Sequence, residues 1–336
     1  MTALRTRGGV LAVAVAAALV VAVGLAAAGA FGGCEQTAEK AGRPSAAVSS
    51  TAYGAVATVL AKTFARNVHP RAADTWGEIK AREFVFNAFQ QYGYFPRTQE
   101  FIASTSRGRV HSANIIAIKE GESAQRLIVG AHYDSAPVGE GYSDNATGVG
   151  LLLETAARVK SQITPYTIVF VAFGAEEKGL LGSRYYVRAM DDLERRATIG
   201  MINLDAVAGG SALSVTSRFG GPTWLRDDAL TAAKSLSIPL GTSPAGKSRP
   251  AGVSIAPSDD VPFALEDIAT AAFTATDWEA ADTGLAATGA DGRLWHSRND
   301  TVAYIERTYP GRVRRQLADL SRLFETLLTS KLEKRP

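Results

Sequence analysis

The stretch RLIVGAHYDSAPVGEGYSDNATGVGLLLETAARVK, residues 126–160, joins a β-branched apolar run to an apolar-periodic segment through a polar loop. The run is typical of a buried strand, and the periodic segment is typical of an amphipathic helix. His132, Asp134 and Asp144 lie between the two, among Gly, Ser and Asn residues. They are either surface groups, with Asp144 capping the helix, or ligands of a metal ion. The remainder of the chain decides between these interpretations.

Apolar strand-like runs and helix-like segments continue to alternate on both sides of this stretch. The further strand-like runs are 113–120, 166–177, 199–207 and 269–278. The further helix-like segments are 52–66, 73–94 with Asp74 as its cap, 182–190 and 307–332. Strands that are apolar throughout and separated by helices indicate a sheet covered on both faces. The sequence therefore predicts an α/β fold, with a mixed, mostly parallel central sheet flanked by helices on both faces, in one domain over residues 51–336.

Potentially ligating side chains lie where the apolar part of three of these runs ends. They are His132 and Asp134, then Glu176 and Glu177, then Asp205, while His296 lies in the polar loop LWHSRNDT before the last helix. Ligands of open α/β sheets bind beyond the carboxyl ends of the strands. Each residue alone is commonly a surface group, but only four histidines occur in the chain and two of them fall in this set. His69 and His111 have no acidic neighbour in sequence, and we interpret them as structural or surface residues.

The residue types in this set, imidazoles and carboxylates without a thiolate, suit zinc or a similar divalent ion in a catalytic site. Two histidines and three carboxylates exceed the ligand number of a single open tetrahedral zinc. They fit two ions about 3.5–4 Å apart that share a bridging carboxylate. One carboxylate then remains for proton transfer, so the sequence predicts a hydrolytic site with two metal ions.

Residues 1–34 differ in kind from the rest of the chain. Arg5 and Arg7 are followed by an uncharged, apolar run that ends at Cys34. A run of more than about 18 apolar residues can span a bilayer, with its basic end on the cytoplasmic side. Two interpretations stay open: a retained signal anchor that forms an apolar N-terminal helix, or a lipoprotein signal in which FGGC ends at a lipid-bearing Cys34. We expect an extracytoplasmic protein, membrane-anchored or secreted, with the polar residues 35–50 as a linker.

The charge balance and the cysteine usage exclude several classes of protein. With 36 basic and 33 acidic residues the net charge is +3, and no basic run with interleaved aromatic residues occurs. We therefore expect no nucleic-acid partner. Cys34 is the single cysteine, which excludes an intrachain disulfide.

Several sequence blocks resemble those of the aminopeptidase Y family, the secreted dizinc exopeptidases that form family twenty-eight of the metallopeptidases. The blocks are HYDS with SDNATG, AFGAEEKGLLGSRYYV, INLDAV and WHSRNDT, in the family's order and within residues 75–330. The resemblance implies the zinc-exopeptidase fold, of the phosphorylase/hydrolase-like type, and two zinc ions as cofactors. It also implies that peptides with a free N-terminus are hydrolysed by a metal-activated water, with a Glu as general base.

Carried over residue by residue, the resemblance assigns a role to each candidate. The implied zinc ligands are His132 and Asp205 on one ion, Glu177 and His296 on the other, and Asp144 on both. Glu176 is the implied general base and acid. Asp134 is expected to accept a hydrogen bond from the second ring nitrogen of His132 and so to fix its tautomer. The family also leads us to expect a cis peptide bond between Asp144 and Asn145.

Two positions depart from the family pattern. Trp295 stands where related aminopeptidases often have a Tyr that assists the oxyanion, and Asp260, in SDDVPF, stands where the superfamily usually has His. Glutaminyl cyclases, relatives on the same fold, also have Trp at the first position, so a glutaminyl-peptide cyclotransferase is one alternative function. A catalytically inactive binding homologue is the other. We expect the segment 216–250 to form either part of the substrate pocket wall or a plain surface loop.

Overall fold

The computed structural model describes residues 48, 50–218, 221–242, 257–275 and 294–332. The predicted signal or anchor segment 1–34, and nearly all of the predicted linker 35–50, lie outside the described residues. Within the described ranges, no helix is both long enough and apolar enough to cross a membrane.

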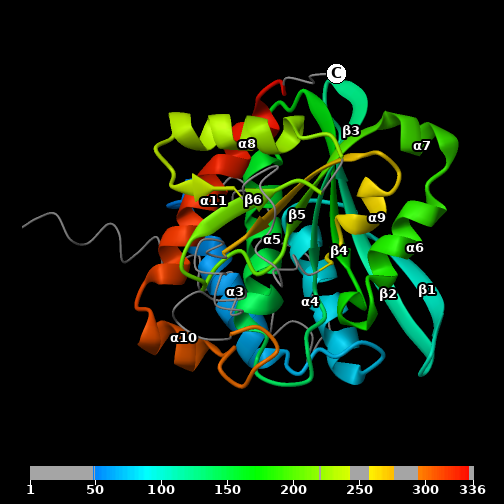
Figure 1. The fold of residues 1–336 in the computed structure, drawn as a ribbon, viewed down its shortest axis with the longest axis vertical. Coiled ribbons are helices and arrows are strands. Elements are labelled where there is room, and N and C mark those ends of the chain that lie inside the picture. Colours follow the sequence, from blue (N-terminus) through cyan, green and yellow to red (C-terminus); the bar gives the residue numbers. More distant parts are fainter. Residues whose placement is uncertain (1–47, 49, 219–220, 243–256, 276–293, 333–336) are drawn as a thin grey trace, which may run out of the picture.

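A mixed sheet of eight strands forms the centre of the described part of the chain (Figure 1). The strands are β1 (Arg97–Thr105), β2 (Gly108–Lys119), β3 (Ser123–His132), β4 (Tyr166–Phe173), β5 (Thr198–Leu204), β6 (Leu213–Thr216), β7 (Leu240–Gly241) and β8 (Ala269–Thr274). Their order across the sheet is β1-β2-β4-β3-β5-β8-β6-β7. The central strands β4, β3, β5 and β8 run parallel, and antiparallel pairings flank them on both sides. The predicted α/β class with a mixed sheet is thus confirmed.

Helices cover both faces of this sheet (Figure 1). One face carries α3 (Ala55–Asn67), α4 (Trp76–Gln91), α5 (Thr147–Val159), α8 (Trp224–Ser235), α10 (Val302–Thr308) and α11 (Arg312–Thr329). The other carries α6 (Leu181–Ala189), α7 (Asp192–Ala197) and α9 (Val261–Ala264). In β4, Ile168 and Phe170 pack into the core of the first face, whereas Val169 and Val171 pack into the core of the second. This alternation explains why the strand is apolar throughout.

Gly130 in β3 shows how closely the second face is packed next to the polar loop. A Cβ atom at this position would lie 2.4 Å from Phe173 Cε2 and 3.1 Å from Met201 Cε. Core side chains at this density cannot move aside without cost, so the position requires glycine. The close packing holds the end of β3, where His132 is the last residue.

One predicted helix cap is wrong, one of the two alternatives for 216–250 is excluded, and the start of one predicted helix is corrected. Asp74 does not cap α4, because it lies one residue before the N-cap position, where it has a left-handed φ of 62°. The cap is Thr75, which is extended and whose side chain accepts the Glu78 N–H, as is preferred for the residue directly before a helix. The segment 216–250 is no plain surface loop, since it contains α8 and β7, although its residues 219–220 and 243–250 lie outside the described part. The predicted long helix within 307–332 is α11, but it begins only at Arg312, because Gly311, with a φ of 70°, separates it from the end of α10 at Thr308.

Candidate metal centre

The ends of three parallel strands bring most of the candidate residues to one edge of the sheet. His132 ends β3, Asp205 directly follows β5, and Glu176 and Glu177 form a short 3-10 turn after β4. Parallel strands present their carboxyl ends at the same edge, so side chains 73 residues apart in sequence, His132 and Asp205, lie in contact. The loops that carry Asp144 and His296 approach the same edge, as their contacts with these residues show.

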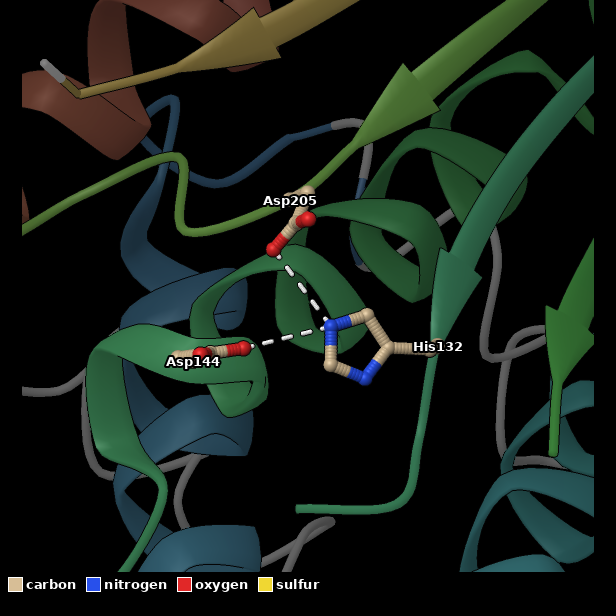
Figure 2. Close-up of side chains that lie close together, drawn as sticks. All are labelled: His132, Asp144 and Asp205. Carbon is tan, nitrogen blue, oxygen red and sulfur yellow. Dashed lines mark hydrogen bonds and ion pairs between the residues drawn. The ribbon is translucent and has the colours of Figure 1, made fainter. Parts of the chain in front are cut away.

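His132, Asp144 and Asp205 form the first cluster of potential metal ligands (Figure 2). His132 Nε2 lies 3.2 Å from Asp144 Oδ1 and 3.4 Å from Asp205 Oδ1. The second oxygen of Asp205 accepts a 2.7 Å hydrogen bond from the Ser258 hydroxyl, which orients that carboxylate. One imidazole nitrogen and two carboxylate oxygens therefore face one another at the sheet edge.

Asp144, Glu177 and His296 form the second cluster, and Asp144 belongs to both. His296 Nε2 lies 3.3 Å from Asp144 Oδ2 and 2.9 Å from Glu177 Oε2. Oδ1 of Asp144 faces His132, and Oδ2 faces His296. One carboxylate thus directs its two oxygens to two separate sets of potential metal ligands. In each cluster the donor atoms lie within 4.8 Å of one another, so each set could hold one metal ion.

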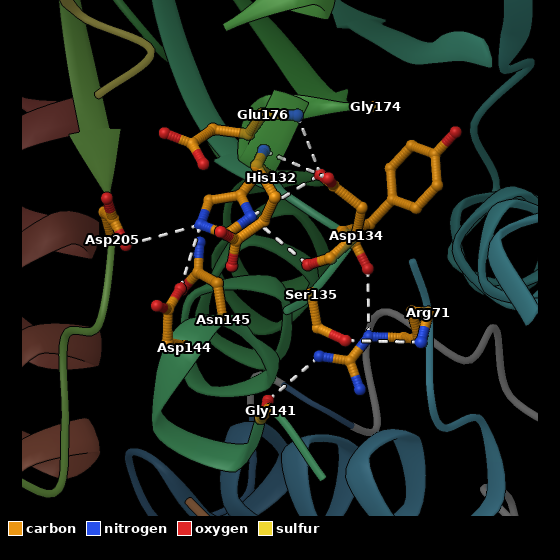
Figure 3. A network of polar contacts seen from close by, with 12 residues as sticks. Arg71, His132, Asp134, Ser135, Gly141, Asp144, Asn145, Gly174, Glu176 and Asp205 are labelled. Carbon is orange, nitrogen blue, oxygen red and sulfur yellow. Dashed lines mark hydrogen bonds and ion pairs between the residues drawn. The ribbon is translucent and has the colours of Figure 1, made fainter. Parts of the chain in front are cut away.

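Asp134 supports this edge of the sheet from behind His132 (Figure 3). His132 Nδ1 lies 3.2 Å from the main-chain oxygen of Asp134 and 3.6 Å from its carboxylate. A carbonyl oxygen only accepts, so Nδ1 donates, and in its neutral form the ring therefore carries its lone pair on Nε2. The Asp134 carboxylate instead accepts the main-chain N–H groups of Glu176, at 3.0 Å, and Glu177, at 3.1 Å. The predicted support of His132 thus comes mainly from the main chain of Asp134, while its side chain holds the Glu176–Glu177 turn.

Burial and crowding shift the pKa values of these groups. Burial lowers the pKa of His132, but the surrounding carboxylates outweigh this effect and hold the pKa well above its ordinary value. Hydrogen bonds to Asp144 and Glu177 raise the pKa of His296 to about 10. Burial raises the pKa of Glu176 well above its ordinary value and raises that of Glu177 as well. A dense group of buried carboxylates with few cations favours either protons or a divalent ion.

One candidate ligand, and residues beside two others, have unusual backbone conformations. Ala175, Ala206 and His296 have left-handed φ values of 55°, 47° and 52°. For residues other than Gly such conformations cost about 1–3 kcal/mol each and persist only where the surrounding contacts require them. The peptide bond between Asp144 and Asn145 is cis, as the family resemblance led us to expect. Several of the loops that carry the candidate ligands therefore have main-chain conformations that are rare for residues other than Gly.

Three residues near the site were not singled out in the sequence. Asp300 is buried, and its carboxylate accepts the main-chain N–H groups of Ser143, at 2.6 Å, and Asp144, at 3.1 Å. Asp259 is also buried, and burial raises its pKa to about 7. Arg71 lies beneath the loop that leads to Asp144. Asp300 and Asp259 belong to the blocks WHSRNDT and SDDVPF, so the family resemblance could have identified both as site residues. No motif in the sequence around Arg71 indicates a role at the site.

Trp295 and Asp260, the two residues that depart from the family pattern, both make defined contacts in the structure. Trp295 is half-buried and packs against the core of the first face. Asp260 is buried, and Arg218 donates two hydrogen bonds of 2.5 Å to its two carboxylate oxygens. A salt bridge thus occupies the position where the superfamily usually has His.

Comparison with known sequences places this chain among peptidases. A family model described as Peptidase family M28 matches residues 114–321. The alkaline phosphatase isozyme conversion protein of Escherichia coli (strain K12) is 31% identical over 315 residues, 83% of this chain and 91% of that protein. Aminopeptidase YwaD of Bacillus subtilis (strain 168) is 36% identical over 174 residues, 48% of this chain and 35% of that protein. The probable lipoprotein aminopeptidase LpqL of Mycobacterium tuberculosis is 39% identical over 115 residues, 34% of this chain and 23% of that protein.

Solved structures share the fold. A zinc aminopeptidase from Bacillus subtilis, BSAP, superposes with a TM-score of 0.68 at 19% identity, covering 84% of this chain and 97% of that one. The glutaminyl cyclase of Porphyromonas gingivalis superposes with a TM-score of 0.66 at 19% identity, covering 82% and 98%. The family model spans most of the sheet and both clusters, and one relative matches over most of both chains. The resemblance seen in the sequence is thereby confirmed: the chain belongs to peptidase family M28.

Proposed function

We propose that this chain is a zinc-dependent aminopeptidase that hydrolyses N-terminal residues from peptides. Membership of the peptidase family and the aminopeptidases among its relatives support peptide hydrolysis. The observation that carries the proposal is the Asp144 carboxylate, whose two oxygens lie 3.2 Å from His132 Nε2 and 3.3 Å from His296 Nε2. A carboxylate shared in this way is the arrangement that a two-metal hydrolytic site requires.

The donor atoms fit a pair of zinc ions. In the proposal His132 and Asp205 hold one ion, Glu177 and His296 hold the other, and Asp144 holds both. Glu177 Oε1 is buried and has no hydrogen-bond partner among the described residues, which is costly for a carboxylate unless a cation binds it. Imidazole and carboxylate donors without thiolate are those of catalytic zinc sites. When bound, two such ions would lower the pKa of a water molecule and polarise the scissile carbonyl.

Glu176 is the proposed proton carrier of the reaction. It is not a member of either ligand cluster, although the next residue, Glu177, is. Hydrogen bonds from the main chain of both residues to Asp134 hold the turn in place. The Glu176 carboxylate would accept the proton of the attacking water and deliver it to the nitrogen of the leaving amine. Burial raises the pKa of Glu176, which favours the uptake of a proton by its carboxylate.

A glutaminyl-peptide cyclotransferase is the second candidate function. Trp295 and the fold shared with a solved glutaminyl cyclase favour it. The second cluster, formed by Asp144, Glu177 and His296, favours the peptidase, because two sets of ligands fit a hydrolytic site with two metal ions. Hydrolysis of aminoacyl anilides, measured beside cyclisation of a peptide with N-terminal Gln, separates the two activities. Neither activity in a zinc-loaded sample would support an inactive binding homologue.

Zinc content tests the ligand assignment directly. We expect about two zinc ions per chain after reconstitution. Asp144→Ala is expected to lose both ions because Asp144 belongs to both clusters, whereas His296→Ala is expected to keep one. Elemental analysis of gel-filtered protein measures the ratio, with the exposed Asp192→Ala as the matched control. If Asp144→Ala retained two ions, the bridging assignment would be wrong.

We also propose that residues 1–34 carry the chain out of the cytoplasm and tether it to the membrane. The relative LpqL, named a probable lipoprotein aminopeptidase, supports the lipoprotein form of this tether. Metabolic labelling with palmitate is then expected to mark the wild-type chain and not Cys34→Ser. Equal labelling of both would exclude Cys34 as the lipid attachment site, and no labelling of either would favour a retained signal anchor.

A further inference from the structure

Arg71 is a fully buried charged residue that the proposed reaction does not use. Its exposed fraction is 0%, which is rare for Arg in the absence of a partner charge. All four hydrogen bonds of its guanidinium go to main-chain carbonyl oxygens. The guanidinium carbon of Arg71 lies over the aromatic ring of Phe64, 4.5 Å from the ring centroid. The side chain is therefore built into the backbone of the loops around it.

These bonds fasten both ends of the loop that separates two proposed zinc ligands (Figure 3). Arg71 Nε donates to the carbonyl oxygen of Tyr133 at 2.9 Å, directly after His132. Nη1 donates to Glu140 at 2.8 Å, and Nη2 to Gly141 at 2.9 Å, three residues before Asp144. A single rigid fork thus joins the two ends of the segment 133–141.

Two further contacts draw this loop against Arg71. The Arg71 main-chain N–H donates to the Ser135 hydroxyl at 3.2 Å, and the Ser135 N–H donates to the Arg71 carbonyl at 3.3 Å. Gly141 has a φ of 57°, and a Cβ there would lie 2.6 Å from Arg71 Nη2 and 2.8 Å from the Asp144 oxygen. Gly141 is therefore needed so that the main chain can approach the guanidinium while turning towards Asp144.

Nearby carboxylates that do not pair directly with Arg71 balance its positive charge. Burial lowers its pKa to about 10, against the opposing effect of the Asp300, Asp134 and Asp144 carboxylates. The guanidinium therefore stays charged at neutral pH. It offsets part of the repulsion among the clustered carboxylates without occupying any of their oxygens.

We propose that Arg71 is a positioning residue that sets the spacing between His132 and Asp144, and through it the zinc affinity of the site. This inference rests on the proposed zinc-binding function. Metal ligands are held in productive geometry by the residues behind them, and loss of such support typically lowers metal affinity about 10–100-fold. Lys keeps the charge but not the planar fork, so Arg71→Lys removes the clamp while leaving the electrostatic balance.

The test compares zinc affinity in Arg71→Lys and in a matched buried control. Arg158 is 1% exposed and is paired with Glu154 in α5. In the described part of the chain its hydrogen bonds and ion pairs involve none of the candidate ligands, so Arg158→Lys reports general destabilisation. Competition with a chromogenic chelator, on protein shown by circular dichroism to be folded, is expected to give about 10–100-fold weaker zinc binding for Arg71→Lys. Arg158→Lys is expected to bind zinc as the wild type does, and the cobalt-substituted absorption spectrum should change only in Arg71→Lys.

The outcomes separate this inference from the proposed function. A wild-type chain that binds no zinc overturns both. A wild type that binds zinc, with an unchanged affinity and cobalt spectrum in Arg71→Lys, overturns only the role of Arg71. Should Arg71→Lys not fold, Ser135→Ala removes just the hydroxyl that accepts from Arg71, and is expected to weaken zinc binding several-fold. Unchanged affinity in Ser135→Ala would then overturn the inference.

Discussion

Replacement of Glu176 by Gln is expected to lower kcat for aminoacyl anilide hydrolysis by about 10²–10⁴-fold. Gln has nearly the same shape as Glu but cannot take up the proton of the attacking water. The zinc content is expected to stay at the wild-type value, because Glu176 belongs to neither ligand cluster. The loss should therefore appear in kcat and leave both KM and bound metal nearly unchanged.

Glu83→Gln is the matched control for this measurement. Glu83 is exposed on α4, so the same chemical change there is expected to leave the kinetics unaltered. If Glu176→Gln kept the wild-type kcat with zinc bound, Glu176 would not be the proton carrier. If it lost zinc as well as activity, the separation between the Glu176 and Glu177 roles would be wrong.

Glu154→Ala is expected to destabilise the fold by about 3–5 kcal/mol, the range for removal of one partner from a buried ion pair. Glu154 is fully buried in α5 and accepts 2.7 Å and 2.6 Å hydrogen bonds from Arg158 Nε and the Ser321 hydroxyl. It also accepts the main-chain N–H groups of Gly54, at 2.9 Å, and Ala57, at 2.6 Å. Its loss would leave buried donors unsatisfied at the start of α3 and on α11, together with a buried guanidinium short of its closest counter-charge.

Urea unfolding of the metal-free chain, followed by circular dichroism, measures this loss. The control is Glu266→Ala, which removes an ion pair with Arg195 that is partly exposed on both sides. Exposed pairs contribute about 0–1 kcal/mol, so the control is expected to change stability little. Glu154→Gln keeps the shape and should recover part of the loss. Equal, small effects of Glu154→Ala and Glu266→Ala would show that the α3–α5–α11 junction does not depend on Glu154.

The short-range pattern of the chain was sufficient to predict the central architecture. β3, α5, β4 and β5 each overlap for most of their length with a run whose own residues carry the strand or helix signal. Because these strands are parallel, their polar ends had to converge, and this made residues such as His132 and Asp205 candidates for one site. β1 was missed because its burial alternates irregularly and half its length faces solvent, which leaves a weak periodic signal.

The tertiary structure alone decided which atoms meet. The sequence alone singled out Asp144 as a candidate, but only the fold shows that its two oxygens face different imidazoles. Arg71 reaches Gly141 across 70 positions, and Glu154 reaches Ser321 across 167. A periodic pattern shows only which side of each helix or strand faces the core and which side faces solvent. Contacts between distant segments depend on the way whole elements pack, so a buried Arg or Glu that joins them has no local signature in the sequence.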